Sequence, residues 1–186
     1  MYVLKVLLLL AVFCTSTIIG ILISKKYSNR VLILKDFKNA LNMFEVKINF
    51  SCETIPEIFM EISQKMNGVV SRIFSDAVNN MNLKNMMAGE AWERAVEENG
   101  EFLKKDDINC IKTLGKLLGK TDIDGQISQI QLVSSFVEKQ INEASEEKSK
   151  NEKMYQKLGV IVGLVIIIVL LWLKKGMNTY EYRFII

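Results

Sequence analysis

The sequence predicts an all-α protein: a small antiparallel bundle of about six helices flanked by two transmembrane helices. Two uncharged apolar runs, residues 6–24 and 158–173, lie near the two ends of the 186-residue chain. Between them, apolar residues recur at intervals of three and four, which is the spacing of one face of an α-helix. The chain has a single proline and no hairpin-type Asn-Gly dipeptide between alternating runs, so little sheet is expected.

These observations divide the chain into parts. We expect an N-terminal transmembrane anchor over residues 1–24 and a soluble helical bundle, ending in a stalk helix, over residues 25–153. A C-terminal transmembrane helix is expected over residues 154–173, followed by a short tail, residues 174–186, to which the sequence assigns no role.

The first apolar run has 19 residues. At 1.5 Å per residue a helix of this length reaches about 28 Å, close to the thickness of the hydrocarbon core of a bilayer. The alternative is a cleaved signal peptide, but only Lys5 precedes the run and no Ala-x-Ala-like site lies before Lys25. A retained signal anchor is therefore the favoured interpretation.

The second apolar run is shorter, at 16 residues. It spans a bilayer if Tyr155 and Lys157 lie among the headgroups and Trp172 marks the opposite interface. The alternative is a buried core helix, which is disfavoured because the run has no polar face and ends abruptly at Lys174.

Flanking charges and small residues add two expectations for these runs. More Lys and Arg residues lie on the side of each run that faces the middle of the chain than on its other side. The excess is clear for the first run and weak for the second, so the positive-inside rule places the middle of the chain in the cytoplasm.

Small residues recur at helical spacing in both runs and would let the two membrane helices pack closely. They are Ser16, Gly20, Ser24, Gly159 and Gly163.

Composition argues against several functions. The residues from 25 to 157 carry 20 basic and 20 acidic side chains, so no basic excess points to nucleic acid. The chain has no histidine, Walker A sequence or GxSxG motif, and we expect no catalysis, cofactor, metal or small-molecule substrate. The three cysteines, Cys14, Cys52 and Cys110, are widely spaced and fit a reducing compartment better than a disulfide framework.

The first four helices of the middle part are expected as follows. One helix buries a stripe that includes Phe37 and lies within residues 34–48. The next begins with Thr54 as its cap, Pro56 in the first turn and Glu57 completing a capping box. Three further expectations are a stop at Gly68, a third helix over residues 69–81 and a short fourth helix between Gly89 and Gly100 with Trp92 inward.

A fifth helix is expected over residues 101–118, burying Phe102 among others. The last helix, capped by Thr121 and with Ile123 in its buried stripe, is expected to run without a break over residues 122–173. Its polar stretch, residues 143–153, would form a stalk, and a disordered linker is the alternative.

Charge is unevenly placed along the expected fourth and fifth helices. Residues 90–107 hold seven acidic side chains against three basic ones, whereas Lys112, Lys116 and Lys120 recur at every fourth position. On helices these residues would form an acidic and a basic face. Such charged faces are expected on helices that are exposed to water. The alternative is that the three lysines bind a partner protein.

Three stretches of the sequence are distinctive in combination: LGKLLGKTD, residues 114–122, followed by Gln126; KNEKM, residues 150–154, leading into the second apolar run; and the pair Ala91-Trp92. Together they resemble the stage III sporulation protein AB family. The resemblance covers nearly the whole chain in order. Family members tend to have a Gly-containing turn where residues 49–52 lie here, and they tend to stop soon after the second apolar run.

The resemblance implies a soluble domain similar to the F domain of type II secretion platform proteins. It implies a place in the mother-cell membrane around the forespore, within a transenvelope channel complex. The expected partners are the other subunits of that complex and a cytoplasmic ATPase, stage III sporulation protein AA. The function expected is a non-enzymatic platform or adaptor, and a membrane-tethered signalling or self-associating scaffold is the alternative.

The first of these stretches also has a structural interpretation. Gly115 and Gly119 would lie on one helix face and admit a neighbouring helix, or Gly119 would end the fifth helix. The alternative is a partner-binding epitope. The residues concerned are Leu114, Gly115, Leu118, Gly119, Thr121, Asp122 and Gln126.

Overall fold

The computed structural model describes residues 2–51, 53–116, 118–120 and 122–181. Two compact units make up the chain. One consists of residues 1–28 and 147–186, and the other of residues 29–146. We refer to them as the hairpin unit and the bundle unit and describe each by itself.

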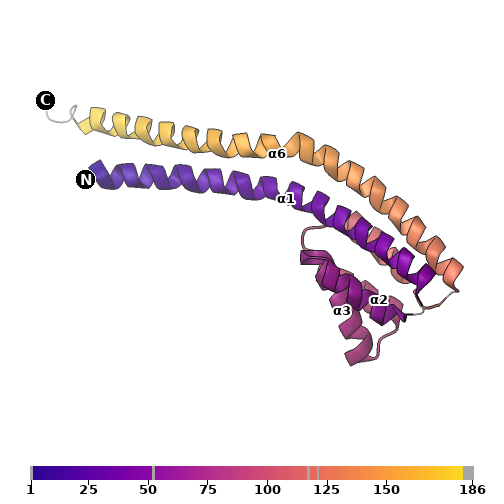
Figure 1. Cartoon of the computed structure of the whole chain (residues 1–186). Helices are drawn as coiled ribbons and strands as arrows, with labels where there is room; N and C mark the ends of the chain where they lie inside the picture. The colour runs from indigo at the N-terminus through magenta and orange to yellow at the C-terminus, as the bar shows by residue number, and fades with distance from the viewer. Residues whose placement is uncertain (1, 52, 117, 121, 182–186) are drawn as a thin grey trace. The chain divides into compact units, whose positions relative to one another are not determined.

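The two terminal helices, α1 (Tyr2–Phe50) and α6 (Ile123–Glu181), contribute to both units (Figure 1). Each is unbroken within its bounds, so the polar stretch over residues 143–153 is helical and not a disordered linker. By length and composition both helices are able to cross a membrane, with segments of mean hydropathy 2.5 and 1.9. The predicted all-α class with two candidate membrane helices is confirmed.

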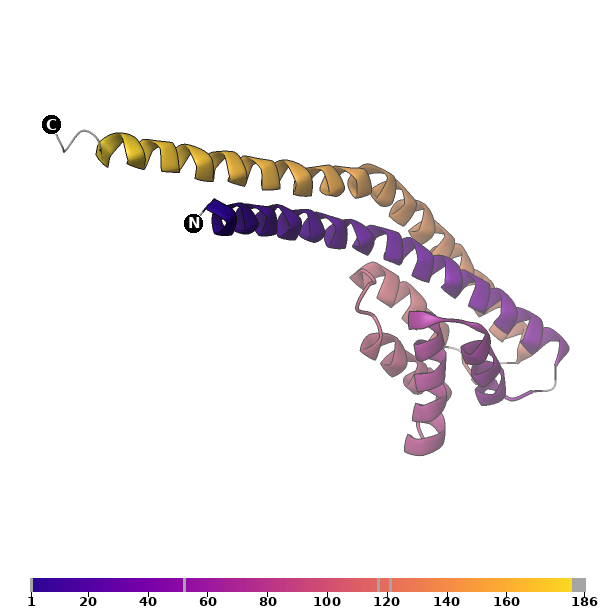
Figure 2. The same cartoon turned by 60° about the vertical axis from the view of Figure 1, so that its left-hand side comes forward.

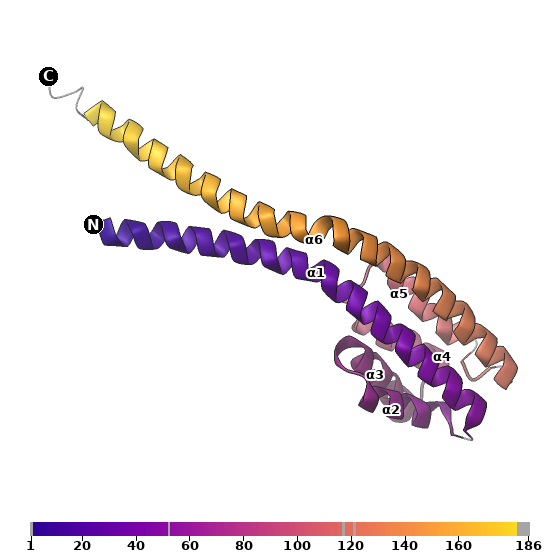
Figure 3. The same ribbon diagram turned by 45° about the horizontal axis from the view of Figure 1, so that its top comes forward.

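In the bundle unit, α1 and α6 are joined by shorter helices: α2 (Ile55–Lys65), α3 (Gly68–Lys84), α4 (Ala88–Glu98), α5 (Lys105–Lys112) and the 3₁₀ helix η1 (Thr113–Lys116). Within this unit α6 lies along one side of α1, and α2 and α3 lie on the other (Figures 1 and 2). Helix α5 lies beside α6 (Figure 3). The part of the chain that the structure describes contains no strand.

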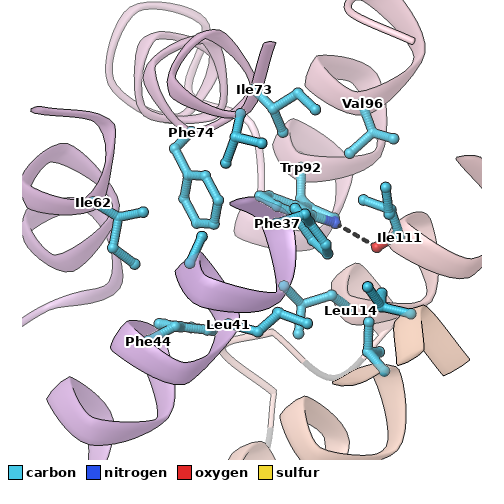
Figure 4. Packing of buried hydrophobic residues seen from close by; sticks show 14 of the residues in the cluster. Phe37, Leu41, Phe44, Ile62, Ile73, Phe74, Trp92, Val96, Ile111 and Leu114 are labelled. Carbon is cyan, nitrogen blue, oxygen red and sulfur yellow. Dashed lines mark hydrogen bonds between the residues drawn. The ribbon is translucent and has the colours of Figure 1, made fainter. Parts of the chain in front are cut away.

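The core of the bundle unit is aromatic at its centre. The rings of Phe59, Phe74 and Trp92 lie 4.9 to 5.3 Å apart, and Phe37 and Phe44 extend the cluster from α1. The indole Nε1 of Trp92 donates to the Ile111 carbonyl at 2.9 Å, so the one polar group of this buried ring has a partner (Figure 4). The inward placement predicted for Trp92 and the stripe of the first helix is confirmed.

Several predicted helix ends are also confirmed. The Glu57 carboxylate accepts from the Thr54 N–H at 2.7 Å, which is the glutamate half of the predicted capping box, and it also accepts from the Thr54 hydroxyl at 2.8 Å. These two hydrogen bonds lower the pKa of Glu57. Pro56 lies in the first turn of α2, where its missing N–H leaves no helical hydrogen bond unmade.

Other predicted boundaries are wrong. Gly68 does not stop α2, which ends at Lys65; it begins α3 with a φ of +62°. The fifth helix begins at Lys105 and ends at Lys112, because residues before and after it form turns and η1. As a result Phe102 is not in the core and is 36% exposed.

The start of the last helix also differs from the prediction. Thr121, the predicted cap, lies outside the described residues, as do Leu117 and Cys52. Asp122 caps the helix instead, because its Oδ1 accepts from the Gly125 N–H at 3.0 Å. Ile123 was predicted in the buried stripe but is 55% exposed, since the core contacts of α6 begin one turn later.

Candidate interaction sites

The first site is the corner between α5 and α6, where η1 approaches the start of α4. Gly115 is buried in η1, and a Cβ built on it would lie 2.8 Å from the carbonyl oxygen of Gly89 and 3.2 Å from Cδ1 of Trp92. A Cβ on Gly89 would collide with the Gly115 carbonyl in turn. Leu114 and Leu118 are buried in the core on either side. The backbones of α4 and η1 therefore meet at two glycines.

Gly119 has a different role from the one its spacing suggests. It has a φ of +71° and lies in the turn after η1, so it does not share a helix face with Gly115. A Cβ on Gly119 would meet only Cδ1 of Ile55 at 3.6 Å and Cβ of Ala88 at 3.8 Å. The glycine is needed for its backbone conformation and not for close packing.

Two glutamines of α6 lie at the same corner. Gln126 and Gln129 line a small pocket with Phe44, Leu114 and Leu118. Gln129 Nε2 donates to the Thr113 carbonyl at 2.6 Å, which ties η1 to α6. Sequence analysis named Gln126 at this corner and did not single out Gln129.

The three predicted docking lysines do not form one helix face. Lys112 ends α5, Lys116 lies in η1, and Lys120 follows the turn at Gly119. Lys112 Nζ lies 2.5 Å from Glu97 and 3.7 Å from Glu93, both on α4, and the hydrogen bond with Glu97 raises the pKa of Lys112. The expected separation into an acidic and a basic face is wrong at Lys112. Lys116 and Lys120 are exposed.

A buried ion pair ties three helices of the bundle unit together. Arg30 Nε and Nη2 on α1 donate to Oδ2 and Oδ1 of Asp107 on α5 at 2.7 and 2.8 Å, and the two side chains are 5% and 0% exposed. Arg30 also donates to Gln140 Oε1 on α6 at 3.2 Å, while Asp107 accepts from the Lys104 N–H at 2.8 Å. Arg30 therefore belongs to the bundle core and not to the charges that flank the membrane.

Sequence analysis had no signal for this pair. Arg30 lies among the Lys and Arg residues that follow the first apolar run, and Asp107 lies at the end of the acidic segment over residues 90–107. Asp107 occupies the first turn of α5 and accepts from the backbone N–H of the capping residue, Lys104. The pairing itself joins residues 77 positions apart, which no local pattern indicates.

The second site lies in the hairpin unit, where α1 and α6 cross at two glycines. A Cβ on Gly20 would lie 2.9 Å from Cα of Gly159, and a Cβ on Gly159 would lie 3.0 Å from Cα of Gly20. Ser16 Oγ donates to the Gly159 carbonyl at 2.8 Å. A Cβ on Gly163 would approach Phe13 Cδ2 to 3.0 Å. The predicted packing residues of the two apolar runs thus lie against one another.

Polar contacts continue this pairing beyond the apolar runs. Gln156 Nε2 donates to Ser24 Oγ at 3.1 Å, and the Ser28 hydroxyl donates to Glu152 Oε1 at 3.0 Å. Between them the rings of Tyr27 and Tyr155 stack at 5.8 Å, and the hydrogen bond between these tyrosines raises the pKa of Tyr27. Of these residues, sequence analysis had placed only Ser24 at a helix contact and Tyr155 at the headgroups.

Metal ligands and thiols are the other groups in the described residues that could carry chemistry. Among residues 2–51, 53–116, 118–120 and 122–181, no group of three or more His, Cys, Asp or Glu side chains could hold a metal ion. Cys14 and Cys110 are free thiols, and burial together with the nearby Asp107 charge raises the pKa of Cys110 to about 11.

An all-helical bundle whose first and last helices are both long and apolar enough to cross a membrane defines a class of all-α protein with two candidate membrane helices. The family model for stage III sporulation protein AB matches residues 5–171, and the chain belongs to that family. Stage III sporulation protein AB of Bacillus subtilis (strain 168) is 26% identical over 170 residues, which are 90% of this chain and 99% of the relative.

A solved structure of stage III sporulation protein AB has the same fold. The two superpose with a TM-score of 0.60 at 22% identity, over 64% of this chain and 96% of the other. This likeness extends the agreement in sequence to the arrangement of the helices. The match to the family model and the likeness in sequence to the Bacillus subtilis protein give the chain a role in sporulation.

Proposed function

We propose that the chain is a non-enzymatic membrane platform of the channel complex between mother cell and forespore. In this role it couples a cytoplasmic secretion-type ATPase, stage III sporulation protein AA, to the membrane part of the complex. The hairpin unit anchors it in the mother-cell membrane, and the bundle unit faces the cytoplasm. Family membership supports the role in sporulation.

One observation carries the proposal. The same two helices supply the close crossing at Gly20 and Gly159 and a large part of the bundle core, including Phe37 of α1 and Val137 of α6. A displacement of α1 or α6 by a partner of the bundle therefore acts on a helix that also contributes to the membrane pair. A protein anchored through a separate linker would lack this continuity.

Within the bundle the core is built to move as one body. The buried pair of Arg30 and Asp107, with Gln140, links α1, α5 and α6 by charge-assisted hydrogen bonds. The Gly89–Gly115 contact and the Gln129 bond to Thr113 add α4 and η1. A partner that binds the corner of α4, α5 and η1 would consequently act on α1 and α6.

Lys116 and Lys120 are the docking residues that this proposal favours. Both are exposed at the corner, whereas Lys112 is held by Glu97 and Glu93 of the same chain. An acidic surface on the ATPase would complement these two lysines, and such pairing affects mainly the rate of association and its salt dependence.

The test is calorimetric titration of the purified ATPase into the full chain held in lipid nanodiscs at moderate salt. We expect saturable binding that the pair of substitutions Lys116→Glu and Lys120→Glu weakens at least tenfold. Lys139→Glu, an exposed position on α6, is the matched control and should bind as the parent does. Absence of binding by a folded parent chain would overturn direct coupling to this ATPase.

A further inference from the structure

A groove runs along one side of the helix pair in the hairpin unit. Its volume is about 440 Å³, and both helices line it over residues 12–23 and 155–166. Its walls are almost wholly apolar, and they include Val12, Ile19, Ile23, Tyr155, Val162 and Ile166. Gly20 and Gly159, at which the two helix backbones are in close contact, are among the residues that line the groove. A groove of this kind in a membrane helix pair is filled by something apolar.

The charges beside the groove indicate what fills it. Lys26 lies seven residues after Ile19 and three after Ile23, so it continues the groove face of α1 by one turn. Lys148 lies seven residues before Tyr155 and continues the groove face of α6 in the same way. Both lysines therefore lie beyond the Tyr155 end of the groove, on the side away from Ile166.

The wider surroundings of this end are also basic. Within the hairpin unit, the stretches next to the apolar runs carry six lysines and two glutamates. Glu152 accepts from Ser28 at 3.0 Å and lies 3.9 Å from Lys148. The lysines are Lys25, Lys26, Lys148, Lys150, Lys153 and Lys157. An apolar groove that opens at a positive rim matches an occupant with an apolar tail and an anionic head.

We propose that the groove binds an acidic glycerophospholipid. One acyl chain lies between α1 and α6 along residues 12–23 and 155–166, and the phosphate is held by Lys26 with Lys148 adding to the positive field. Clusters of lysines next to a membrane helix attract anionic lipids by about fivefold in affinity for each lysine near the surface. The proposal requires both helices to lie in a bilayer, but it does not depend on the ATPase.

The test uses the full chain reconstituted in phosphatidylcholine vesicles. The vesicles contain a trace of either phosphatidylglycerol or phosphatidylcholine with a spin label on the acyl chain, and electron spin resonance measures the motionally restricted fraction of each. We expect phosphatidylglycerol to be preferred at least about fivefold, and Lys26→Gln to lower the preference by about fivefold. Val162→Trp, which fills the groove and leaves every charge in place, should abolish the preference.

The matched control is Lys157→Gln. Lys157 is exposed two residues after Tyr155 and is therefore on a different face of α6 from the groove. Lys157 belongs to the basic surroundings but faces away from the groove, so Lys157→Gln should lower the preference for phosphatidylglycerol much less than Lys26→Gln does. Equal motional restriction of the two lipids would overturn the proposal. An equal loss of the preference for phosphatidylglycerol in Lys26→Gln and Lys157→Gln would also overturn it, because the preference would then depend on overall charge and not on the groove. A chain that fails to float with the vesicles would contradict the membrane anchor itself.

Discussion

Arg30 and Asp107 form a buried two-point ion pair between α1 and α5, with oxygen–nitrogen distances of 2.7 and 2.8 Å. Such a pair adds little to stability compared with well-packed apolar residues, but losing one partner leaves a buried charge without its counterion. Its value to the bundle is that it fixes how α1, α5 and α6 pack. This geometry gives the first prediction.

Asp107→Ala should lower the free energy of unfolding by about 3 to 5 kcal/mol, because the Arg30 guanidinium stays buried without its carboxylate. Denaturant unfolding of the detergent-solubilised chain, followed by circular dichroism, measures this. Asp106→Ala is the control, since Asp106 is the exposed neighbour. The double change of Arg30→Met with Asp107→Leu should cost less than Asp107→Ala alone. Equal effects of the two single substitutions would contradict the role given to the pair.

The two glycines of the corner should respond differently to alanine. Gly115→Ala places a methyl group 2.8 Å from a backbone oxygen of α4, so the backbones must separate, at a cost of about 2 to 3 kcal/mol. Gly119→Ala meets no close atom and should cost only about 1 kcal/mol, from its left-handed backbone. Thermal unfolding of the two variants ranks them, and the reverse order would show that the corner packs in another way.

Trp92→Phe should destabilise the bundle even though it keeps an aromatic ring in the core. The substitution removes the hydrogen bond from the indole to the Ile111 carbonyl and leaves that carbonyl without this donor, at a cost of about 1 to 3 kcal/mol. Phe74→Leu is a useful comparison, because it changes a neighbouring ring that has no such bond. Equilibrium unfolding, followed by circular dichroism, gives both values.

The thiol of Cys110 should react slowly in the folded chain. Its pKa is raised from 9.0 to about 11, so near pH 8 the thiolate is about a hundredfold scarcer than in the unfolded chain. In a chain with Cys14→Ser and Cys52→Ser, alkylation by iodoacetamide should be slow at pH 8 and rise tenfold for each pH unit toward 11. Unfolding in urea should restore the ordinary rate. Rapid alkylation of the folded chain at pH 8 would contradict the burial of this thiol.

Local signals in the sequence predicted much of the fold. The capping box at Thr54 and Glu57, the apolar stripe around Phe37 and the inward Trp92 each depend on residues within a few turns of one another. The fifth helix was overextended because Phe102 fits its spacing. The chain instead forms a turn before Lys105, and α5 begins there. Asp107, in the first turn of α5, accepts hydrogen bonds from the Lys104 N–H and from Arg30.

The sites were less predictable because they depend on contacts between distant residues. Gly115 and Gly119 have the spacing of a helix face, yet η1 and the turn after it give the two glycines separate roles. The partner of Gly115 is Gly89, on another helix. In the hairpin unit the small residues were recognisable by spacing, whereas the contacts of Tyr27 and Ser28 with α6 had no local pattern.

Under the proposed coupling, a partner that binds the bundle unit changes the distance between α1 and α6 in the hairpin unit. Spin labels at Ile18→Cys and Val165→Cys, two exposed positions of the hairpin unit, report the distance between α1 and α6 in a chain without its native cysteines. We expect the distance distribution in nanodiscs to shift when the ATPase and ATP are added together, and not with either alone. An unchanged distribution, under conditions where the ATPase is bound and hydrolysing ATP, would contradict coupling through α1 and α6.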